Sequence, residues 1–527
     1  MLKRAISLYI IFGVSLAVLM GRIVYLNNSE YSVASENNTV RTLTVGEKRA
    51  TIYDRNYVKL TNSKSKLVAV VTPAAGAIPH IKKYMSEKEL EEKIKAGFPF
   101  TLEVNERINN ELIRTFEVPE RYSYPQPAIH IIGYTDSDGK TGVSGLERAY
   151  NSFLNDNSGT LTVSFQADAK GRILPGMDKT INDDNYSSDA GIVLTVDSKI
   201  QNITQRALKN SKIESGCAIV MHVDTGEIFA LASVPDYDPD NVALSLNKEN
   251  SPFINKAFQS YCVGSVFKPL VVAAALENGK SVNTQYECTG EITVGDTVFS
   301  CYNRQSHGKV DMTGALEQSC NTYFINLIMN MDVELLLSLC ESIGLGKSDE
   351  IYNGCFTSSG AIPKSEQLRI KGELANLAFG QGRLMMTPVQ MLKMYHVLAT
   401  GNYIPTKLIR GFTDYKGIIT TQKEELPVKI LSDSTVTALR EMLSSVVEKG
   451  NADKACSRLV SLAGKTGTAQ SGIHKNGKEI CRTWFAGFFP SHNPHYIVVV
   501  MSEEGESGNI DCAPVFKEIC EEICTVH

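Results

Sequence analysis

A serine and a lysine three residues apart stand at the head of an apolar run in the middle of the chain. Ser265 and Lys268 are followed by Pro269 and by mostly apolar residues up to Gly279. Proline is tolerated in the first turn of a helix and glycine is common just after the last, so we predict a helix that begins at about Ser265. Lys268 then lies on the same face, one turn above Ser265. A serine hydroxyl becomes a nucleophile when a nearby base takes its proton, and a lysine whose pKa is lowered by burial is such a base.

Two further polar segments follow at wide spacing. The segment Ser319-Cys320-Asn321 comes after a predicted helix over 312–318 and offers a hydroxyl and an amide, which can donate and accept together. The segment Lys465-Thr466-Gly467-Thr468 follows the apolar run 459–463 and is typical of a strand. Lys465 supplies positive charge for a carboxylate, and Gly467 lets a substrate backbone approach the strand closely. Each segment alone is a weak signal, whereas the three in this order favour acyl transfer through a serine.

These three segments resemble the active-site boxes of penicillin-binding proteins and serine β-lactamases. Four other segments resemble sequence motifs of class B penicillin-binding proteins in particular. They lie at 49–56, 142–147, 380–382 and 484–488. The similarity extends from about residue 40 to the C-terminus. Ala50 and Tyr57 stand where that family usually has glycine, and Val263 stands where it usually has proline.

The resemblance implies a fold and a division of the chain. We expect an α+β transpeptidase domain of the penicillin-binding and serine β-lactamase type, with an antiparallel sheet and a helical subdomain, over residues 191–527. An elongated, mainly β pedestal is expected over 46–190, and the polar segment Asn182 to Ala190 is the expected boundary. The strands predicted at 192–196, 217–223, 227–232, 484–489 and 496–501 fit an antiparallel sheet around a helical middle.

The resemblance also implies a role for each residue of the boxes. Lys268 takes the proton from Ser265, which attacks the penultimate D-Ala carbonyl of a peptidoglycan stem peptide, and a β-lactam mimics that peptide. Ser319 relays a proton to the leaving D-Ala, and Lys465 keeps the Ser319 hydroxyl ready for that transfer. Asn321 binds the amide of the donor peptide, and Thr466 and Thr468 bind its terminal carboxylate. Gly467 lets the peptide approach the strand closely. The backbone N–H groups of Ser265 and Thr468 form the oxyanion hole.

Composition narrows the alternatives. The chain has 527 residues, a formal net charge of −5 and 43% hydrophobic residues, so it has no basic footprint for nucleic acid. The 9 histidines and 12 cysteines show no zinc-like spacing, and we expect neither a metal site nor a cofactor. Cys288 and Cys301 flank a predicted hairpin with its turn at Gly295-Asp296, where a disulfide or two buried thiols both fit. His307 is interpreted as a hydrogen-bonding loop residue, and Trp484 as a packing residue.

The N-terminus indicates a membrane anchor. Residues 5–26 are almost uncharged and long enough to span a bilayer if Arg22 reaches the interface, whereas a cleaved signal peptide would have a shorter apolar core. Lys3 and Arg4 place the expected cytoplasmic tail, 1–4, inside the cell, and a stalk over 27–45 leads to an extracytoplasmic catalytic domain. The resemblance to class B penicillin-binding proteins also implies a partner, a polytopic membrane glycosyltransferase.

Two alternatives stay open from the sequence. A serine β-lactamase or a D,D-carboxypeptidase uses the same fold and resolves the acyl-enzyme with water, although these usually lack the N-terminal boxes. A scaffold of cell-wall synthesis without catalytic activity is the other, and the three complete boxes argue against it. Labelling by penicillin separates the scaffold from the enzymes, and rapid penicillin turnover would indicate the hydrolases.

Overall fold

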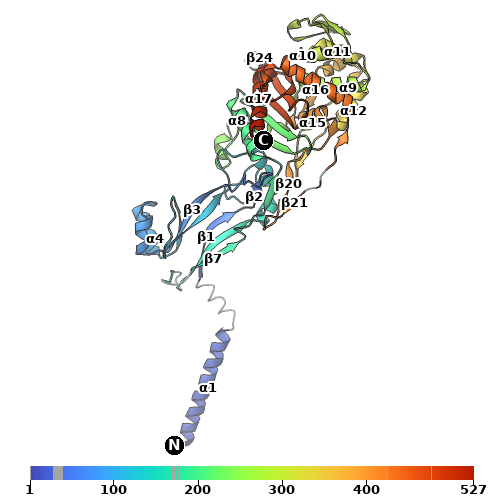
Figure 1. Cartoon of the computed structure of the whole chain (residues 1–527). Helices are drawn as coiled ribbons and strands as arrows, with labels where there is room; N and C mark the ends of the chain where they lie inside the picture. The colour runs from blue at the N-terminus through green and yellow to red at the C-terminus, as the bar shows by residue number, and fades with distance from the viewer. Residues whose placement is uncertain are drawn as a thin grey trace. The chain divides into compact units, whose positions relative to one another are not determined.

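The computed structural model describes residues 2–27, 40–168, 172–174, 179–421, 423, 425–475 and 477–526. Met1 of the expected tail and residues 28–39 of the expected stalk lie outside these ranges. The chain divides into two compact units (Figure 1). The first comprises Met1–Ala50, Asn62–Arg121 and Asn157–Asp189, and the second comprises Thr51–Thr61, Tyr122–Asp156 and Ala190–His527.

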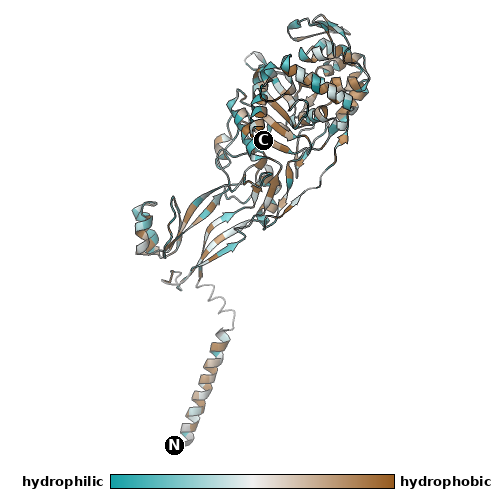
Figure 2. Ribbon diagram, in the orientation of Figure 1, coloured by the Kyte–Doolittle hydropathy of each residue, from teal (hydrophilic) through white to brown (hydrophobic). Residues whose placement is uncertain are grey.

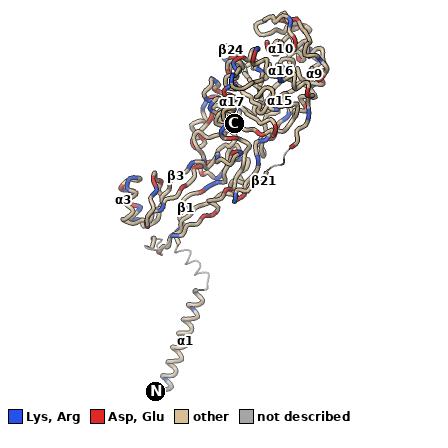
Figure 3. Tube along the Cα trace, viewed as in Figure 1, with Lys and Arg blue, Asp and Glu red and all other residues tan. Residues whose placement is uncertain are grey.

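The predicted anchor lies in a single long helix, α1 (Leu2–Asn27). Its stretch Ile6–Tyr25 is long and apolar enough to cross a membrane. Figure 2 shows that apolar residues dominate the helix, and Figure 3 shows that it carries very little charge. The predicted span over 5–26 therefore coincides with a continuous helix.

The globular part of the first unit is built on two antiparallel sheets of three strands. In strand β6 (Gly159–Gln166), the odd-numbered residues from Gly159 to Phe165 are buried and the even-numbered ones are partly exposed. This alternation is expected of a strand with one face toward the core. Helix α4 (Glu87–Ala96) covers one sheet, and its N-cap Ser86 accepts a hydrogen bond from the N–H of Glu89. The strand orders are β1 (Val40–Lys48), β6 (Gly159–Gln166), β7 (Thr180–Asp184) and β4 (Phe100–Val104), β3 (Lys64–Val71), β5 (Ile113–Glu120).

Two segments of the predicted 46–190 domain group with the second unit rather than with the first. The reason lies in strand pairing: β2 (Thr51–Tyr53) pairs in parallel with β8 (Gly191–Leu194). β8 in turn pairs with β20 (Ile409–Thr413), and β20 with β21 (Ile419–Thr421). Segments 51–61 and 122–156 thus belong by their contacts to the unit that contains Ser265, Ser319 and Lys465.

The second unit is centred on an antiparallel sheet of five strands. Helices α8 (Ser198–Asn210) and α17 (Gly508–Val526) pack together on one face, and α15 (Pro388–Thr400) packs on the other. Because both faces are covered, the inner strands are buried almost throughout. The strand order is β10 (Ile228–Val234), β9 (Gly216–His222), β25 (Tyr496–Gly505), β24 (Lys478–Phe489), β23 (Ala463–Lys475). The predicted α+β class, with strands around a helical middle, is confirmed.

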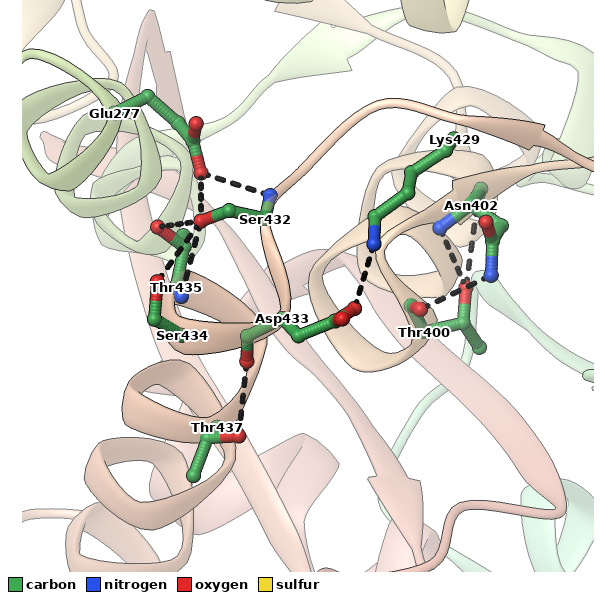
Figure 4. A network of polar contacts seen from close by, with 9 residues as sticks. All are labelled: Glu277, Thr400, Asn402, Lys429, Ser432, Asp433, Ser434, Thr435 and Thr437. Carbon is green, nitrogen blue, oxygen red and sulfur yellow. Dashed lines mark hydrogen bonds and ion pairs between the residues drawn. The ribbon is translucent and has the colours of Figure 1, made fainter.

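Helix α9 (Lys268–Glu277) is the centre of the helical part. Every residue from Lys268 to Ala275 is buried, which suits a helix that is apolar on all sides. The last residue, Glu277, accepts hydrogen bonds from the backbone N–H and the hydroxyl of Ser432, at 3.0 and 2.8 Å (Figure 4). Ser432 is the N-cap of α16, so the far end of α9 is tied to a second helix. The surrounding helices are α10 (Met312–Glu317), α11 (Asn321–Met329), α12 (Val333–Ile343), α15 and α16 (Asp433–Glu448).

Candidate active site

Ser265 lies in a tight turn rather than in the helix that was predicted to begin there. Residues Gly264–Phe267 form the 3₁₀ turn η4, and α9 begins at Lys268 with Pro269 in its first turn. The N–H of Lys268 donates to the carbonyl of Ser265. Since residues three apart eclipse each other in a 3₁₀ turn, the expected stacking of the lysine over the serine survives this correction. Ser265 is half-buried, so its hydroxyl remains within reach of a substrate.

Glycines hold this turn against its neighbours. Gly264 has φ +72°, its N–H donates to the carbonyl of Gly380 at 2.8 Å, and a Cβ at Gly264 would lie 3.0 Å from the carbonyl oxygen of Thr468. A Cβ at Gly380, which has φ +79°, would lie 2.0 Å from the carbonyl oxygen of Gly264. The 380–382 segment recognised in the sequence therefore supports the turn that carries Ser265.

Lys268 joins the first box to the second. Its side chain is fully buried, and Nζ donates to the carbonyl of Ser319 at 2.7 Å, to Ser319 Oγ at 3.1 Å and to Asn321 Oδ1 at 2.8 Å. Desolvation lowers the pKa of Lys268 to about 7, against smaller opposing effects of the Cys320 and Cys301 thiols. A large fraction of the lysine is thus uncharged at neutral pH, as a general base requires.

Ser319 and Asn321 are held by the junction of two helices. Ser319 adopts φ +52°, a left-handed conformation that is unusual for serine, directly after α10. Asn321 opens α11, and its Nδ2 donates to the carbonyl of Ser300 at 3.0 Å. Backbone strain of this kind persists when the surroundings impose it, and it is common at functional sites.

Lys465 lies fully buried on β23, the edge strand of the main sheet. Its Nζ donates to Asn451 Oδ1 and to Thr466 Oγ1, both at 3.3 Å. Burial, with a smaller effect from the positive charge of Lys268, holds the pKa of Lys465 well below its usual value. The lysines of the first and third boxes therefore lie near enough to repel each other.

Among the described residues, β23 has a partner strand on one side only, β24. A Cβ at Gly467 would lie 2.9 Å from Val266 Cγ1, so only glycine allows the strand to approach the turn that carries Ser265 so closely. Thr466 is buried, whereas Thr468 is exposed and its Oγ1 accepts a hydrogen bond from the N–H of Gly508 at 3.3 Å. An extended peptide can pair along such an edge, beside the serine.

The comparisons with known proteins agree with this geometry. Residues 216–521 match the family model described as the penicillin-binding protein transpeptidase domain. The chain belongs to the penicillin-binding protein transpeptidase family. The resemblance to its class B members is confirmed, since the chain is 27% identical to stage V sporulation protein D of Bacillus subtilis, over 94% of this chain and 81% of that protein. It is also 27% identical to the probable peptidoglycan D,D-transpeptidase PenA of Neisseria meningitidis, over 96% and 90% of the two chains.

Solved structures of this family share the fold. The D,D-transpeptidase domain of the peptidoglycan glycosyltransferase of Eggerthella lenta has a TM-score of 0.64 at 24% identity, covering 91% of this chain and 98% of that chain. Penicillin-binding protein 3 of Mycobacterium tuberculosis, complexed with aztreonam, has a TM-score of 0.66 at 22% identity, covering 92% and 97%.

The other residues singled out in the sequence have structural roles. Trp484 is fully buried and its Nε1 donates to the carbonyl of Cys262 at 2.9 Å, as its interpretation as a packing residue requires. In the 49–56 box, Asp54 Oδ1 accepts hydrogen bonds from the N–H groups of Asn56 and Val58, so this box shapes a turn. Glu147, in the 142–147 box, is buried and accepts a hydrogen bond from the Tyr122 hydroxyl.

Two features were missed in the sequence. Asn451, which links Lys465 to Thr466, lies in a loop after α16, and an asparagine beside a glycine there gives no signal beyond a turn. The second is a cluster in space of residues whose spacing in the sequence is not zinc-like: the ligand atoms of Cys288, Cys301, His307 and Cys320 all lie within 4.8 Å of one another. Loops bring these residues together across 33 positions of sequence, which no spacing rule for short zinc motifs detects.

The environment of Lys268 predicts a pH profile for acylation. Because the pKa of Lys268 is about 7, the lysine is protonated and cannot accept the serine proton in acid. We expect the penicillin acylation rate to rise about tenfold per pH unit up to about pH 7 and to level off above it. Cys320 and Cys301 are the titratable neighbours that act on the pKa of Lys268, and Lys268 in turn lowers the pKa of Lys465. Rates measured with a fluorescent penicillin from acid to mildly alkaline pH test this, and a flat profile would contradict it.

Proposed function

We propose that this penicillin-binding protein is a peptidoglycan D,D-transpeptidase that works through an acyl-enzyme on Ser265. Lys268 takes the proton from the Ser265 hydroxyl, and the serine oxygen attacks the carbonyl of the penultimate D-Ala of a stem peptide. The terminal D-Ala leaves with a proton relayed by Ser319, and the amine of a neighbouring stem peptide then resolves the ester to form the cross-link. The observation that carries the proposal is the buried Lys268, which is bound to the second box and has a pKa near neutrality.

The third box completes the site. The N–H groups of Ser265 and Thr468 form the oxyanion hole in this proposal, and the edge of β23 pairs with the extended stem peptide. Thr466 and Thr468 receive the terminal carboxylate, Asn321 holds the peptide amide, and the charge of Lys465 acts on the carboxylate and on Ser319. The hydrogen bonds of the described residues join Lys465 to Asn451 and Thr466, so its action on Ser319 is assigned to the substrate-bound state.

The test of this proposal is the site of penicillin attachment. The detergent-solubilised full chain is treated with penicillin, and the adduct is located by peptide mass spectrometry. We expect one adduct, on the peptide that contains Ser265, and none in Ser265→Ala. A wild-type protein without an adduct would overturn the proposal in favour of a scaffold. Rapid loss of the adduct with release of hydrolysed penicillin would favour a β-lactamase or a carboxypeptidase.

We further propose that α1 anchors the protein, with its N-terminus in the cytoplasm and the catalytic unit outside. The apolar stretch Ile6–Tyr25 supports this, as do the basic residues Lys3 and Arg4 before it. A polytopic glycosyltransferase that supplies glycan strands is the partner that this chemistry requires. We expect deletion of residues 1–27 to move the protein from the membrane fraction to the soluble fraction, as judged by ultracentrifugation and immunoblotting. A truncated protein that still sediments with membranes would contradict the anchor.

A further inference from the structure

Three thiols and one imidazole lie close together beside the segment Ser319-Cys320-Asn321. The Sγ atoms of Cys288 and Cys301 lie 3.8 Å apart, as do those of Cys301 and Cys320. His307 Nδ1 lies 3.4 Å from Cys288 Sγ. The three cysteines are buried and His307 is half-buried. A disulfide has its sulfurs about 2 Å apart, so none of these pairs is bonded in this structure.

These three distances match those of a tetrahedral zinc site, and all four ligand atoms lie within 4.8 Å of one another. With zinc–sulfur bonds of about 2.3 Å, sulfurs at the corners of a tetrahedron lie about 3.8 Å apart, and a zinc–nitrogen bond of about 2.0 Å brings sulfur and nitrogen to about 3.5 Å. Three thiolates and one imidazole are a donor set that selects zinc over magnesium or calcium, and four protein ligands close the site. We propose that Cys288, Cys301, His307 and Cys320 bind one structural Zn²⁺ ion.

The local fold presents these four donors. Cys288 ends strand β12 (Tyr286–Cys288), and His307 precedes its partner strand β15 (Gly308–Val310). Cys301 follows the hairpin of β13 (Glu291–Val294) and β14 (Thr297–Ser300). The N–H of Cys301 donates to the carbonyl of Gly290. Gly290 has φ +96°, and a Cβ there would lie 2.4 Å from the carbonyl oxygen of Arg304. The loops are thus fixed by backbone hydrogen bonds rather than by the thiols alone.

A second layer of contacts supports the donors. The hydroxyl of Thr322 donates to Cys288 Sγ at 3.1 Å and lies 3.4 Å from Cys320 Sγ. Thr322 is fully buried in the first turn of α11. Ser306 Oγ donates to the carbonyl of Cys288 at 2.7 Å. A hydrogen bond to a ligating sulfur orients that ligand, as is usual around structural metal sites.

The proposed metal site includes residues on both sides of the hydrogen bond that holds Asn321 in the segment Ser319-Cys320-Asn321. Cys320 lies between Ser319 and Asn321 in the chain, and Cys301 follows Ser300, whose carbonyl accepts the hydrogen bond from Asn321 Nδ2. A metal that fixes Cys301 and Cys320 therefore also fixes the distance between Asn321 and its carbonyl partner. The ion lies away from the reacting atoms and acts as a positioning element for Ser319 and Asn321.

Metal content tests the site independently of activity. We expect the full-length protein, purified in detergent without chelator, to hold about one zinc per chain by plasma mass spectrometry. Cys301→Ala is expected to lose it, whereas Cys340→Ala, which removes a buried thiol from α12 outside the cluster, is expected to keep it. Wild-type protein without zinc, or zinc retained in Cys301→Ala, would overturn the proposal. A Cys301–Cys320 disulfide found by mass spectrometry in the protein as purified, before any chelator is added, would overturn it as well.

A spectroscopic measurement covers the case in which Cys301→Ala fails to fold. Wild-type protein reconstituted with Co²⁺ is expected to show a thiolate-to-cobalt charge-transfer band in the near ultraviolet and the intense visible bands of tetrahedral cobalt. Zinc is expected to displace both. The weak visible bands of octahedral cobalt without charge transfer would contradict a site made of three thiolates and one imidazole.

The positioning role has its own readout, and this part rests on the proposed function. Removal of the ion by a chelator is expected to lower the rate of penicillin acylation about tenfold, and added Zn²⁺ is expected to restore it. An unchanged rate in protein shown to be metal-free would refute the positioning role and leave the proposed transpeptidase intact. Absence of penicillin labelling with zinc present would refute the enzyme and leave the metal site intact.

Discussion

Lys268→Ala is expected to lower the rate of penicillin acylation by about 10³-fold, because it removes the base proposed for Ser265. The side chain also holds Ser319 and Asn321 through three hydrogen bonds, so its loss frees the second box as well. The rate is measured with a fluorescent penicillin on the full chain in detergent.

Lys268→Arg separates these two effects. Arginine keeps the positive charge and the donors but cannot lose its proton in a protein, so we expect it to be as inactive as alanine. Thermal unfolding of both variants shows whether the fold is kept. Acylation by either variant within tenfold of the wild-type rate would show that another group takes the serine proton.

Gly380→Ala is expected to lower both stability and acylation. A Cβ there would lie 2.0 Å from the carbonyl oxygen of Gly264, which cannot move without displacing Ser265. We expect a loss of about 2–4 kcal/mol in the free energy of unfolding and of about 10²-fold in the acylation rate. Chemical denaturation and penicillin labelling measure the two effects.

Gly354→Ala is the matched control for this substitution. Gly354 also has a positive φ, +68°, but nothing lies within 4 Å of the position of its Cβ. We expect it to cost only about 1 kcal/mol, from the backbone conformation alone, and to leave acylation unchanged. Equal effects of the two variants on acylation would contradict the role of the 380–382 segment as a support for the nucleophile turn.

The site residues were predicted from the chemistry that their side chains could perform. Ser265, Lys268, Ser319 and Lys465 were chosen because a nucleophile, a base and an anion-binding strand need these residue types, and the structure brings Lys268 into contact with Ser319. The start of α9 was placed three residues early, because the periodicity of a 3₁₀ turn also puts Ser265 and Lys268 together. The left-handed backbone of Ser319 gave no signal, since no glycine marks it.

Long-range pairing explains what could not be predicted. The assignment of segments 51–61 and 122–156 to the second unit depends on strand β2 finding β8 across about 140 residues, which local pattern does not encode. The cluster of Cys288, Cys301, His307 and Cys320 depends in the same way on a hairpin and two loops folding back on α11. The hairpin itself, with its Gly295-Asp296 turn, was predicted correctly because its signal is local.

Helix α9 has a consequence for how the enzyme adapts to its substrate. It is enclosed on every side, and its far end is tied to α16 through Glu277 and Ser432. Lys268 therefore lies on an enclosed helix, and Ser265 lies in the turn directly before it, so a shift of either residue would disturb the surrounding core. Accommodation of stem peptides that differ in size is expected instead along the edge of β23.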